Sequence, residues 1–175
     1  AETSSVDLEA LRAASRPLEV EIAEIYRCYA RSGLSYGPAH QGLQSLRVGK
    51  DERGEMVLAQ VSLPASVAQS GAGYGLHPSI LDSALQASIG LELSGASDLQ
   101  TDLQTVPLMV PFALEALQVH GDCPAQAWVW LRRRTQRAEE RGIERLDISV
   151  CDVTGRVCVE LSGLSSRVLQ VAPSA

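Results

Sequence analysis

The chain has 175 residues, enough for one domain with a real hydrophobic core, and its apolar fraction of 45% is ordinary for a globular protein. A net charge of −6 argues against nucleic acid or an anionic membrane as the main partner, and no apolar run is long enough to cross a bilayer. The four cysteines show neither CxxC nor metal-ligand spacing, so we expect a cytoplasmic protein with free thiols and no metal site.

The first elements in chain order are a linker and a helix. Residues 1–16 are rich in Ser, Ala and Glu, which predicts a linker with at most a short helical turn. Pro17 is expected to open a packing helix that ends at Gly33. The apolar stripe of this helix consists of Leu18, Ile22, Ile25, Tyr26 and Tyr29.

Tyr36, Gly37 and Pro38 follow as a turn with two backbone-special residues side by side. One interpretation is a purely structural turn. The other places Tyr36 or His40 at the mouth of a functional site. His40 has no carboxylate near it in the sequence, so we assign it no role as a base.

Alternating and β-rich segments predict an antiparallel sheet, and residues 170–175 are expected to begin a second linker. Two prolines in the third strand, Pro107 and Pro111, indicate an edge, a bulge or a site wall. Trp128 and Trp130 share one face of the fourth strand, where we expect them to cover the sheet. The expected strands are residues 44–48, 55–63, 106–120, 125–134, 145–150 and 156–169.

A long helix is predicted between these strands, from Pro78 to Leu91. Pro78 fits the first helical position, so His77 is the expected N-cap. Asp82 is the only ionisable residue of the helix, and a helix that is apolar nearly all round is a buried one. Its carboxyl group therefore requires an explanation, because a buried Asp is rare unless it is paired or functional.

Asp82 and Gln86 are four residues apart and share one face of this helix. The helix N-terminus favours the carboxylate by roughly 0.3–1 kcal/mol, whereas complete burial favours the neutral acid more strongly. We therefore expect a carboxylic acid that can donate a proton, with the Gln86 amide holding it in place. The alternative is structural: Asp82 binds helix N–H groups and Gln86 is a satisfied polar residue.

Two segments resemble motifs of one enzyme family. His77–Gln86 resembles the HPxxLDxxxQ segment of the dehydratase domains of modular polyketide synthases. Tyr36–Leu43 resembles the YGPxFQGL segment that precedes it, with His40 in place of the usual Phe. The order and separation of the two segments also fit this family.

Weaker similarities extend the resemblance from about Leu18 to Leu169. Met109–Phe112 resembles the family's proline-phenylalanine strand, and the segments at 152–156 and 163–167 resemble its closing hairpin. The family domain is a double hot-dog whose first half carries a catalytic His in an HxxxGxxxxP segment. This chain contains no such segment. It therefore resembles the second, C-terminal half together with the preceding linker.

The resemblance implies an α+β hot-dog fold, an antiparallel sheet wrapped around a long central helix, over residues 17–169. It implies dehydration of a 3-hydroxyacyl thioester, with Asp82 as acid, Gln86 orienting it, and a His base on the missing half or a partner chain. The substrate is expected on the phosphopantetheine of an acyl carrier protein, with no other cofactor. The implied substrate pocket contains Tyr36, Gly37, Pro38, His40, His77, Pro78, Pro111 and Phe112.

Several alternatives remain open at this level. Arg132, Arg133, Arg134 and Arg137 form either a solvated hairpin tip of mixed charge or a docking patch for an acidic carrier protein. The domain is either a dehydratase or a repurposed or inactive hot-dog that isomerises double bonds, assists branching or cyclisation, or holds a substrate. A homodimer formed through the sheets is a further alternative.

Overall fold

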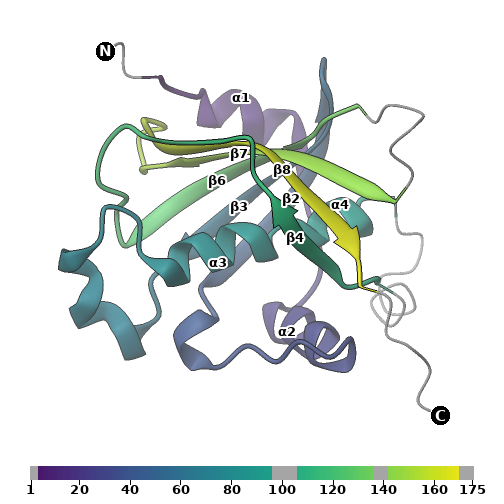
Figure 1. Cartoon of the computed structure of the whole chain (residues 1–175). Coiled ribbons are helices and arrows are strands. Elements are labelled where there is room, and N and C mark those ends of the chain that lie inside the picture. Colours follow the sequence, from purple (N-terminus) through teal and green to yellow (C-terminus); the bar gives the residue numbers. More distant parts are fainter. Residues whose placement is uncertain (1–3, 96–105, 136–141, 170–175) are drawn as a thin grey trace.

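The computed structural model describes residues 4–95, 106–135 and 142–169. It contains one eight-stranded antiparallel sheet with the strand order β1-β2-β3-β6-β7-β8-β4, and β5 also pairs with β8 (Figure 1). The strands are β1 (Ser15–Pro17), β2 (Leu43–Asp51), β3 (Gly54–Ser62), β4 (Met109–Ala113), β5 (Ala116–Val119), β6 (Gln126–Arg133), β7 (Ile143–Cys151) and β8 (Val157–Val168). The helical segments are α1 (Leu8–Ala13), α2 (Ile22–Arg31), η1 (Pro38–His40), η2 (Ala65–Gly73), α3 (Pro78–Gln86) and α4 (Ile89–Leu93).

The sheet curves around α3 and α4, whereas α1 lies on its opposite face (Figure 1). This confirms the expected antiparallel sheet around a central helix. The central helix is not continuous as predicted, because Ser88, Gly90 and Leu91 each donate to the carbonyl three residues earlier. These tighter bonds separate α3 from α4 while the backbone of Ala87 and Ser88 stays right-handed helical.

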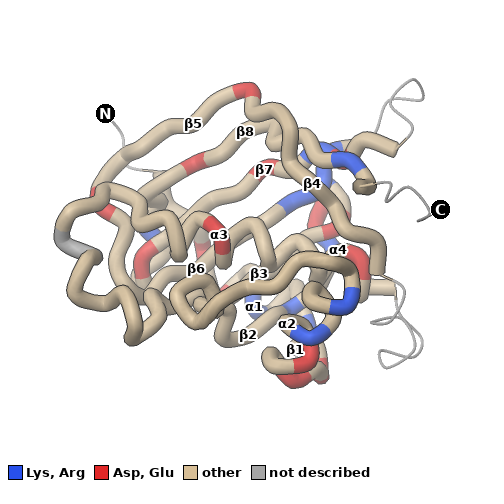
Figure 2. The backbone as a smooth tube through the Cα atoms, turned by 60° about the horizontal axis from the view of Figure 1, so that its bottom comes forward, with Lys and Arg blue, Asp and Glu red and all other residues tan. Residues whose placement is uncertain are grey.

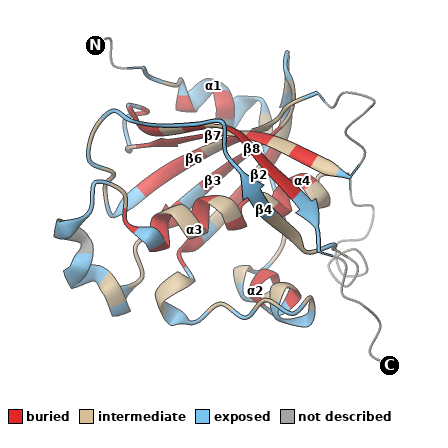
Figure 3. Cartoon of the chain, viewed as in Figure 1, coloured by how far each residue is buried: buried red, intermediate tan, exposed pale blue. Residues whose placement is uncertain are grey.

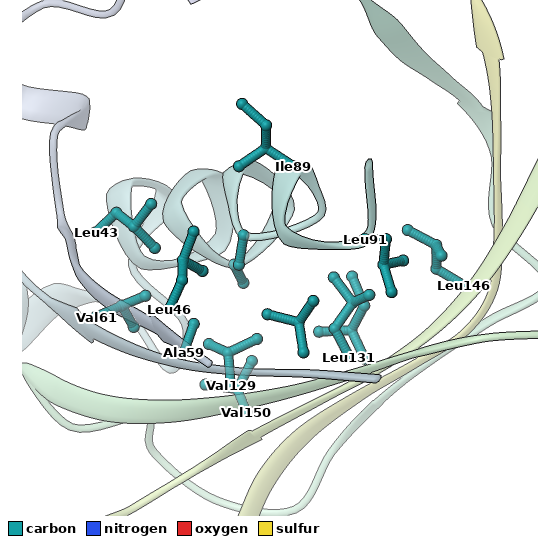
Figure 4. Packing of buried hydrophobic residues seen from close by; sticks show 14 of the residues in the cluster. Leu43, Leu46, Ala59, Val61, Ile89, Leu91, Val129, Leu131, Leu146 and Val150 are labelled. Atoms are coloured by element: carbon teal, nitrogen blue, oxygen red, sulfur yellow. The ribbon is translucent and has the colours of Figure 1, made fainter. Parts of the chain in front are cut away.

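The main core fills the space between the central helix and the sheet. Leu46, Val129 and Leu131 point from the sheet toward the helix, whereas Ile89 lies on the other side of the helix (Figure 4). Strands β6 and β7 are largely buried, whereas part of β4 is exposed (Figure 3). One face of α3 is thus anchored in the core and another face is left for the site.

The outer face of the sheet carries a second apolar cluster under α1. Leu8 and Leu11 of α1 are buried there with Trp128, and the Arg12 guanidinium lies 4.4 Å from the centre of a Trp128 ring. The expectation that this tryptophan covers the sheet is confirmed. The described part of residues 1–16 is not the predicted linker, because it forms α1 and most of β1 and packs on the sheet.

The predicted start of the next helix is also wrong. Pro17 belongs to β1 and pairs with Arg47, and α2 begins only at Ile22. A proline has no N–H to donate, so an edge strand accommodates it as readily as a first helical turn does. The predicted end is confirmed, because α2 ends just before Gly33, which has φ +96°.

Two smaller differences concern the connections. The segment predicted as a loop, residues 64–75, contains the 3-10 helix η2. The strand predicted over residues 106–120 is divided into β4 and β5. Within the described ranges, no helix is long and apolar enough to cross a membrane.

Candidate active site

A cavity of about 460 Å³ lies between the central helix, the end of α2 with the loop after it, and strands β4, β7 and β8. Its wall is largely apolar, with polar groups at a few points. Lining residues include Tyr29, Tyr36, Leu85, Ile89, Met109, Pro111, Leu146 and Leu164, together with Asp82, Glu92 and Glu144. Such a chamber suits an apolar chain that carries a reacting polar group.

The first turn of α3 determines where Asp82 lies. His77 is the N-cap as predicted, since its Nδ1 accepts a hydrogen bond of 3.1 Å from the N–H of Ser79. The other ring nitrogen, Nε2, lies 3.0 Å from the Ser70 hydroxyl. Both nitrogens are therefore occupied away from the cavity, and Asp82 follows one helical turn later on the cavity wall.

Asp82 is less buried than the sequence predicts. Its side chain is 37% exposed, whereas Ile80, Ser83 and Ala84 on the sheet side of α3 are buried. The predicted full burial is therefore wrong, because this face of the helix looks into an open chamber and not into the core.

The structure places an imidazole beside this carboxyl group. His40 Nδ1 lies 2.7 Å from Asp82 Oδ2, and the His40 side chain is 44% exposed. Nδ1 itself is buried and has no aligned hydrogen bond, so the contact is close in distance but off the hydrogen-bond direction. Gly42 makes the approach of the loop to α3 possible, because a Cβ at that position would lie 2.5 Å from the Ser83 hydroxyl oxygen on α3 and 2.6 Å from the carbonyl oxygen of Ser62 on β3.

Gln86 acts on the loop and not directly on Asp82. Its Nε2 donates a 2.8 Å hydrogen bond to the carbonyl oxygen of His40, and its Oε1 accepts one of 2.8 Å from the Tyr26 hydroxyl. Gln86 is almost fully buried, with 1% exposed. The expectation that its amide holds the Asp82 carboxyl directly is not met, since both of these contacts go elsewhere.

Three tyrosines pack together beside this buried glutamine, and two of them, Tyr26 and Tyr29, hydrogen-bond to it. The Tyr36 ring packs edge-on against Tyr26 and Tyr29, with centroid distances of 6.0 and 5.3 Å. The Tyr29 hydroxyl donates to the main-chain oxygen of Gln86 at 2.8 Å. Burial, and next the nearby Asp82 charge, raise the pKa of Tyr36 to about 12, so its phenol is neutral near pH 7.

The expected pocket residues are divided by the structure. Tyr36 and Pro111 line the cavity, whereas Gly37, Pro38 and His40 belong to the loop beside it. His77 and Pro78 form the cap of α3. Phe112 is 51% exposed and lies under the Arg167 guanidinium at 5.5 Å, because neighbouring side chains of a strand point to opposite faces.

The arginine run is largely neutralised by carboxylates. Arg133, in β6, contacts Glu55 at 2.6 Å, Glu92 at 2.8 Å and Glu144 at 2.7 Å. Arg134 pairs with Asp147 and Glu115, each at 2.8 Å, and Figure 2 shows blue and red segments side by side near α4.

Arg132 packs over the Trp130 ring at 4.0 Å. Arg132 and Arg133 thus belong to a strand and not to the predicted hairpin tip, and Arg133 and Arg134 do not offer free positive charge for docking. Arg137 lies outside the described residues.

The acidic end of the cavity is a feature that the sequence did not predict. Glu92 and Glu144 line the same chamber as Asp82. Burial raises the pKa of Glu144, against the effect of Arg133. Glu144 lies on the same face of β7 as Leu146 and Ile148, so an acidic residue at an inward-facing position was the available signal. Among the described residues, no group of three or more His, Cys, Asp or Glu side chains could hold a metal ion.

A sheet wrapped around a helix, with an aspartate on the wall of an apolar chamber, defines a hot-dog domain. The family model described as "Polyketide synthase dehydratase N-terminal domain" matches residues 5–175. The chain belongs to the polyketide synthase dehydratase family. The description of the model names the N-terminal domain, whereas the motifs around Asp82 resemble the second half, so assignment to a half rests on those motifs.

The curated relatives are much longer than this chain. Polyketide synthase PksN of Bacillus subtilis (strain 168) is 40% identical over 147 residues, which is 84% of this chain and 2% of that protein. PksM of the same organism is 34% identical over 169 residues, or 97% of this chain and 4% of that protein. The chain therefore spans only a small part of these synthases.

Solved structures show the same relation at the level of one domain. A dehydratase domain of a trans-AT polyketide synthase from Brevibacillus brevis has a TM-score of 0.81 and 38% identity, covering 97% of this chain and 55% of that one. The dehydratase domain of RzxB from Pseudomonas fluorescens has a TM-score of 0.71 and 27% identity, covering 95% and 54%. The chain thus corresponds to about half of each solved domain, as expected for one half of a double hot-dog.

Proposed function

We propose that this chain supplies the Asp-bearing half of an active site that dehydrates a 3-hydroxyacyl thioester during polyketide synthesis. The observation that carries the proposal is the position of Asp82 on the wall of an apolar cavity of about 460 Å³. Membership of the dehydratase family supports it. The acyl chain would lie along the apolar wall, with its 3-hydroxyl group at Asp82.

The chemistry requires two groups. A base removes the proton from the α-carbon, the Cβ–O bond breaks, and Asp82 gives its proton to the departing hydroxyl, which leaves as water. The three histidines of the chain, His40, His77 and His120, are not among the residues that line the cavity. We therefore assign the base to a His of the second hot-dog half, on the same polypeptide or on a partner chain.

The second half requires an apolar surface on this one. Phe112 and Leu117 are each 51% exposed and Val119 is 58% exposed, on the edge formed by β4 and β5. Large exposed apolar side chains on a strand edge are a natural surface for another sheet. We propose that the second half packs there, and that an acyl carrier protein delivers the substrate on its phosphopantetheine with no other cofactor.

A second candidate function is double-bond isomerisation or substrate holding by a repurposed domain. A described cavity wall without histidine is compatible with this candidate as well as with a base on the second half. Isotope exchange at the α-carbon separates the candidates. Exchange without loss of water identifies an isomerase, and binding of an acylated carrier protein without either process identifies a holding domain.

The main test is Asp82→Asn in the complete two-half domain, assayed with a 3-hydroxyacyl carrier protein. Loss of the general acid is expected to lower kcat by about 10²–10⁴-fold. Asp122→Asn, an exposed aspartate that is not among the cavity-lining residues, is the matched control and should retain full activity. Undiminished dehydration by Asp82→Asn would remove Asp82 from the mechanism.

A further inference from the structure

The loop that ends with His40 is fastened to the same helix that carries Asp82. We propose that His40 is a positioning residue for Asp82: its Nδ1–H donates to Oδ2, keeps the acidic proton on Oδ1, and stabilises the carboxylate once that proton has left. The inference rests on the proposed dehydration and deepens it. In this proposal His40 neither gives nor takes the transferred proton, and acts only through Asp82.

The geometry at the pair supports this role. His40 Nδ1 lies 2.7 Å from Asp82 Oδ2 and is buried, although the rest of the ring is partly exposed. In free enzymes, catalytic hydrogen bonds are often poorly aligned and tighten when substrate binds.

The loop itself is held by hydrogen bonds whose direction is determined. The main-chain N–H of Leu43 donates to the Tyr26 oxygen at 3.0 Å, so the Tyr26 hydroxyl must direct its own hydrogen to Gln86 Oε1. The Gln86 amide then turns its Nε2 to the carbonyl oxygen of His40. This series of hydrogen bonds begins at a backbone donor, Leu43 N–H, and ends at a backbone acceptor, the His40 carbonyl. The direction of each bond is therefore determined, and the series holds the backbone of His40 beside α3.

The other ionisable groups near Asp82 cannot replace this imidazole. Tyr36 and Tyr26 face the same region, and burial raises the pKa of each to about 12, so both are neutral near pH 7. Tyr29 lines the cavity, but its hydroxyl already donates to the Gln86 main-chain oxygen. The motif that this loop resembles carries Phe where this chain has His40, and a Phe ring has no N–H to donate.

The proton balance of the step is simple. Asp82 Oδ1 gives its proton to the leaving hydroxyl, the Cβ–O bond breaks and water departs, while the base on the other half keeps the α-proton. Asp82 is left as a carboxylate, and the His40 Nδ1–H stays on nitrogen as a donor to Oδ2. Hydrogen bonds to a charged acceptor are stronger than neutral ones, so the contact favours the state after proton transfer.

Two substitutions at position 40 separate this role from packing, in the complete domain with a 3-hydroxyacyl carrier protein. His40→Phe keeps a ring but removes the donor, and should lower kcat by about tenfold while KM changes little. His40→Asn places an amide N–H near the position of Nδ1 and should restore most of the loss. His120→Phe removes an imidazole that lies 2.8 Å from Glu160, outside the cavity-lining residues, and should leave kcat unchanged. Unaltered kcat in His40→Phe, or no rescue by His40→Asn, would overturn the proposal.

A second measurement does not depend on turnover. In the domain labelled with ¹⁵N-histidine, the His40 Nδ1 resonance is expected to shift in Asp82→Asn and to stay in place in Glu160→Gln. An unchanged His40 resonance in Asp82→Asn would show that the two groups do not interact. If the wild-type domain fails to dehydrate any substrate but the resonance shifts, the proposed function is at fault and the His40–Asp82 contact is retained.

Discussion

Replacement of Gln86 by leucine tests whether this buried amide joins the loop to the helix. Gln86 is 1% exposed, and its side chain donates to the His40 carbonyl and accepts from Tyr26, each at 2.8 Å. Leucine has nearly the same volume but can do neither. It leaves the buried hydroxyl of Tyr26 without an acceptor, whereas the partly buried His40 carbonyl can turn to water.

The expected loss of stability follows from these two contacts. An unsatisfied buried polar group costs about 1–3 kcal/mol and a lost hydrogen bond about 0.5–1.5 kcal/mol. Part of this is offset by the apolar surface that leucine buries, so Gln86→Leu should lower the free energy of unfolding by about 2–3 kcal/mol. For a domain of this size, that lowers Tm by roughly 5–10 °C.

Urea and thermal unfolding followed by circular dichroism measure the effect. Gln118→Leu, on the exposed strand β5, is the control and should stay within about 0.5 kcal/mol of wild type. Tyr26→Phe combined with Gln86→Leu should cost about 1 kcal/mol less than the sum of the single changes, because both remove the same hydrogen bond. A Gln86→Leu protein as stable as the control would refute the role given to this residue.

Two further predictions concern the closing hairpin. Hydrogen bonding, first from the Thr154 side chain, lowers the pKa of Asp152 from 3.8 to about 2. The unfolded chain therefore takes up this proton first, so the stabilisation is present above about pH 4 and is lost as pH falls toward about 2. Thermal unfolding between pH 5 and pH 2 should show a steeper loss of Tm in wild type than in Asp152→Asn, and equal slopes would contradict the assignment. Gly155 has φ +91°, and a Cβ there would collide with the carbonyl oxygen of Val6, whereas Gly33 has φ +96° but open space around it. Gly155→Ala should thus be less stable than Gly33→Ala by more than about 1 kcal/mol in urea unfolding, and equal losses would show that the collision is relieved.

Local patterns were sufficient for most of the secondary structure. The alternation of apolar residues predicted β2, β3, β6, β7 and β8 to within a few residues, because period-two burial is a property of a strand itself. His77 was recognisable as a cap because Pro78 at a first helical position restricts what precedes it. The errors fell where tertiary contacts decide, as in α1, which is short and is held by packing against Trp128.

The candidate site also has a part that the sequence predicted and a part that only the tertiary structure determined. Asp82 stood out in the sequence because it is the one ionisable group of an apolar helix, and the flanking motifs resembled one family closely enough to imply its chemistry. The exposure of Asp82, its contact with His40 and the course of the Gln86 hydrogen bonds depend on how a loop and two helices pack together. A single helix specifies which of its residues share a face, but only the packed chain decides which face meets the core, which meets a cavity, and which distant side chain arrives beside it.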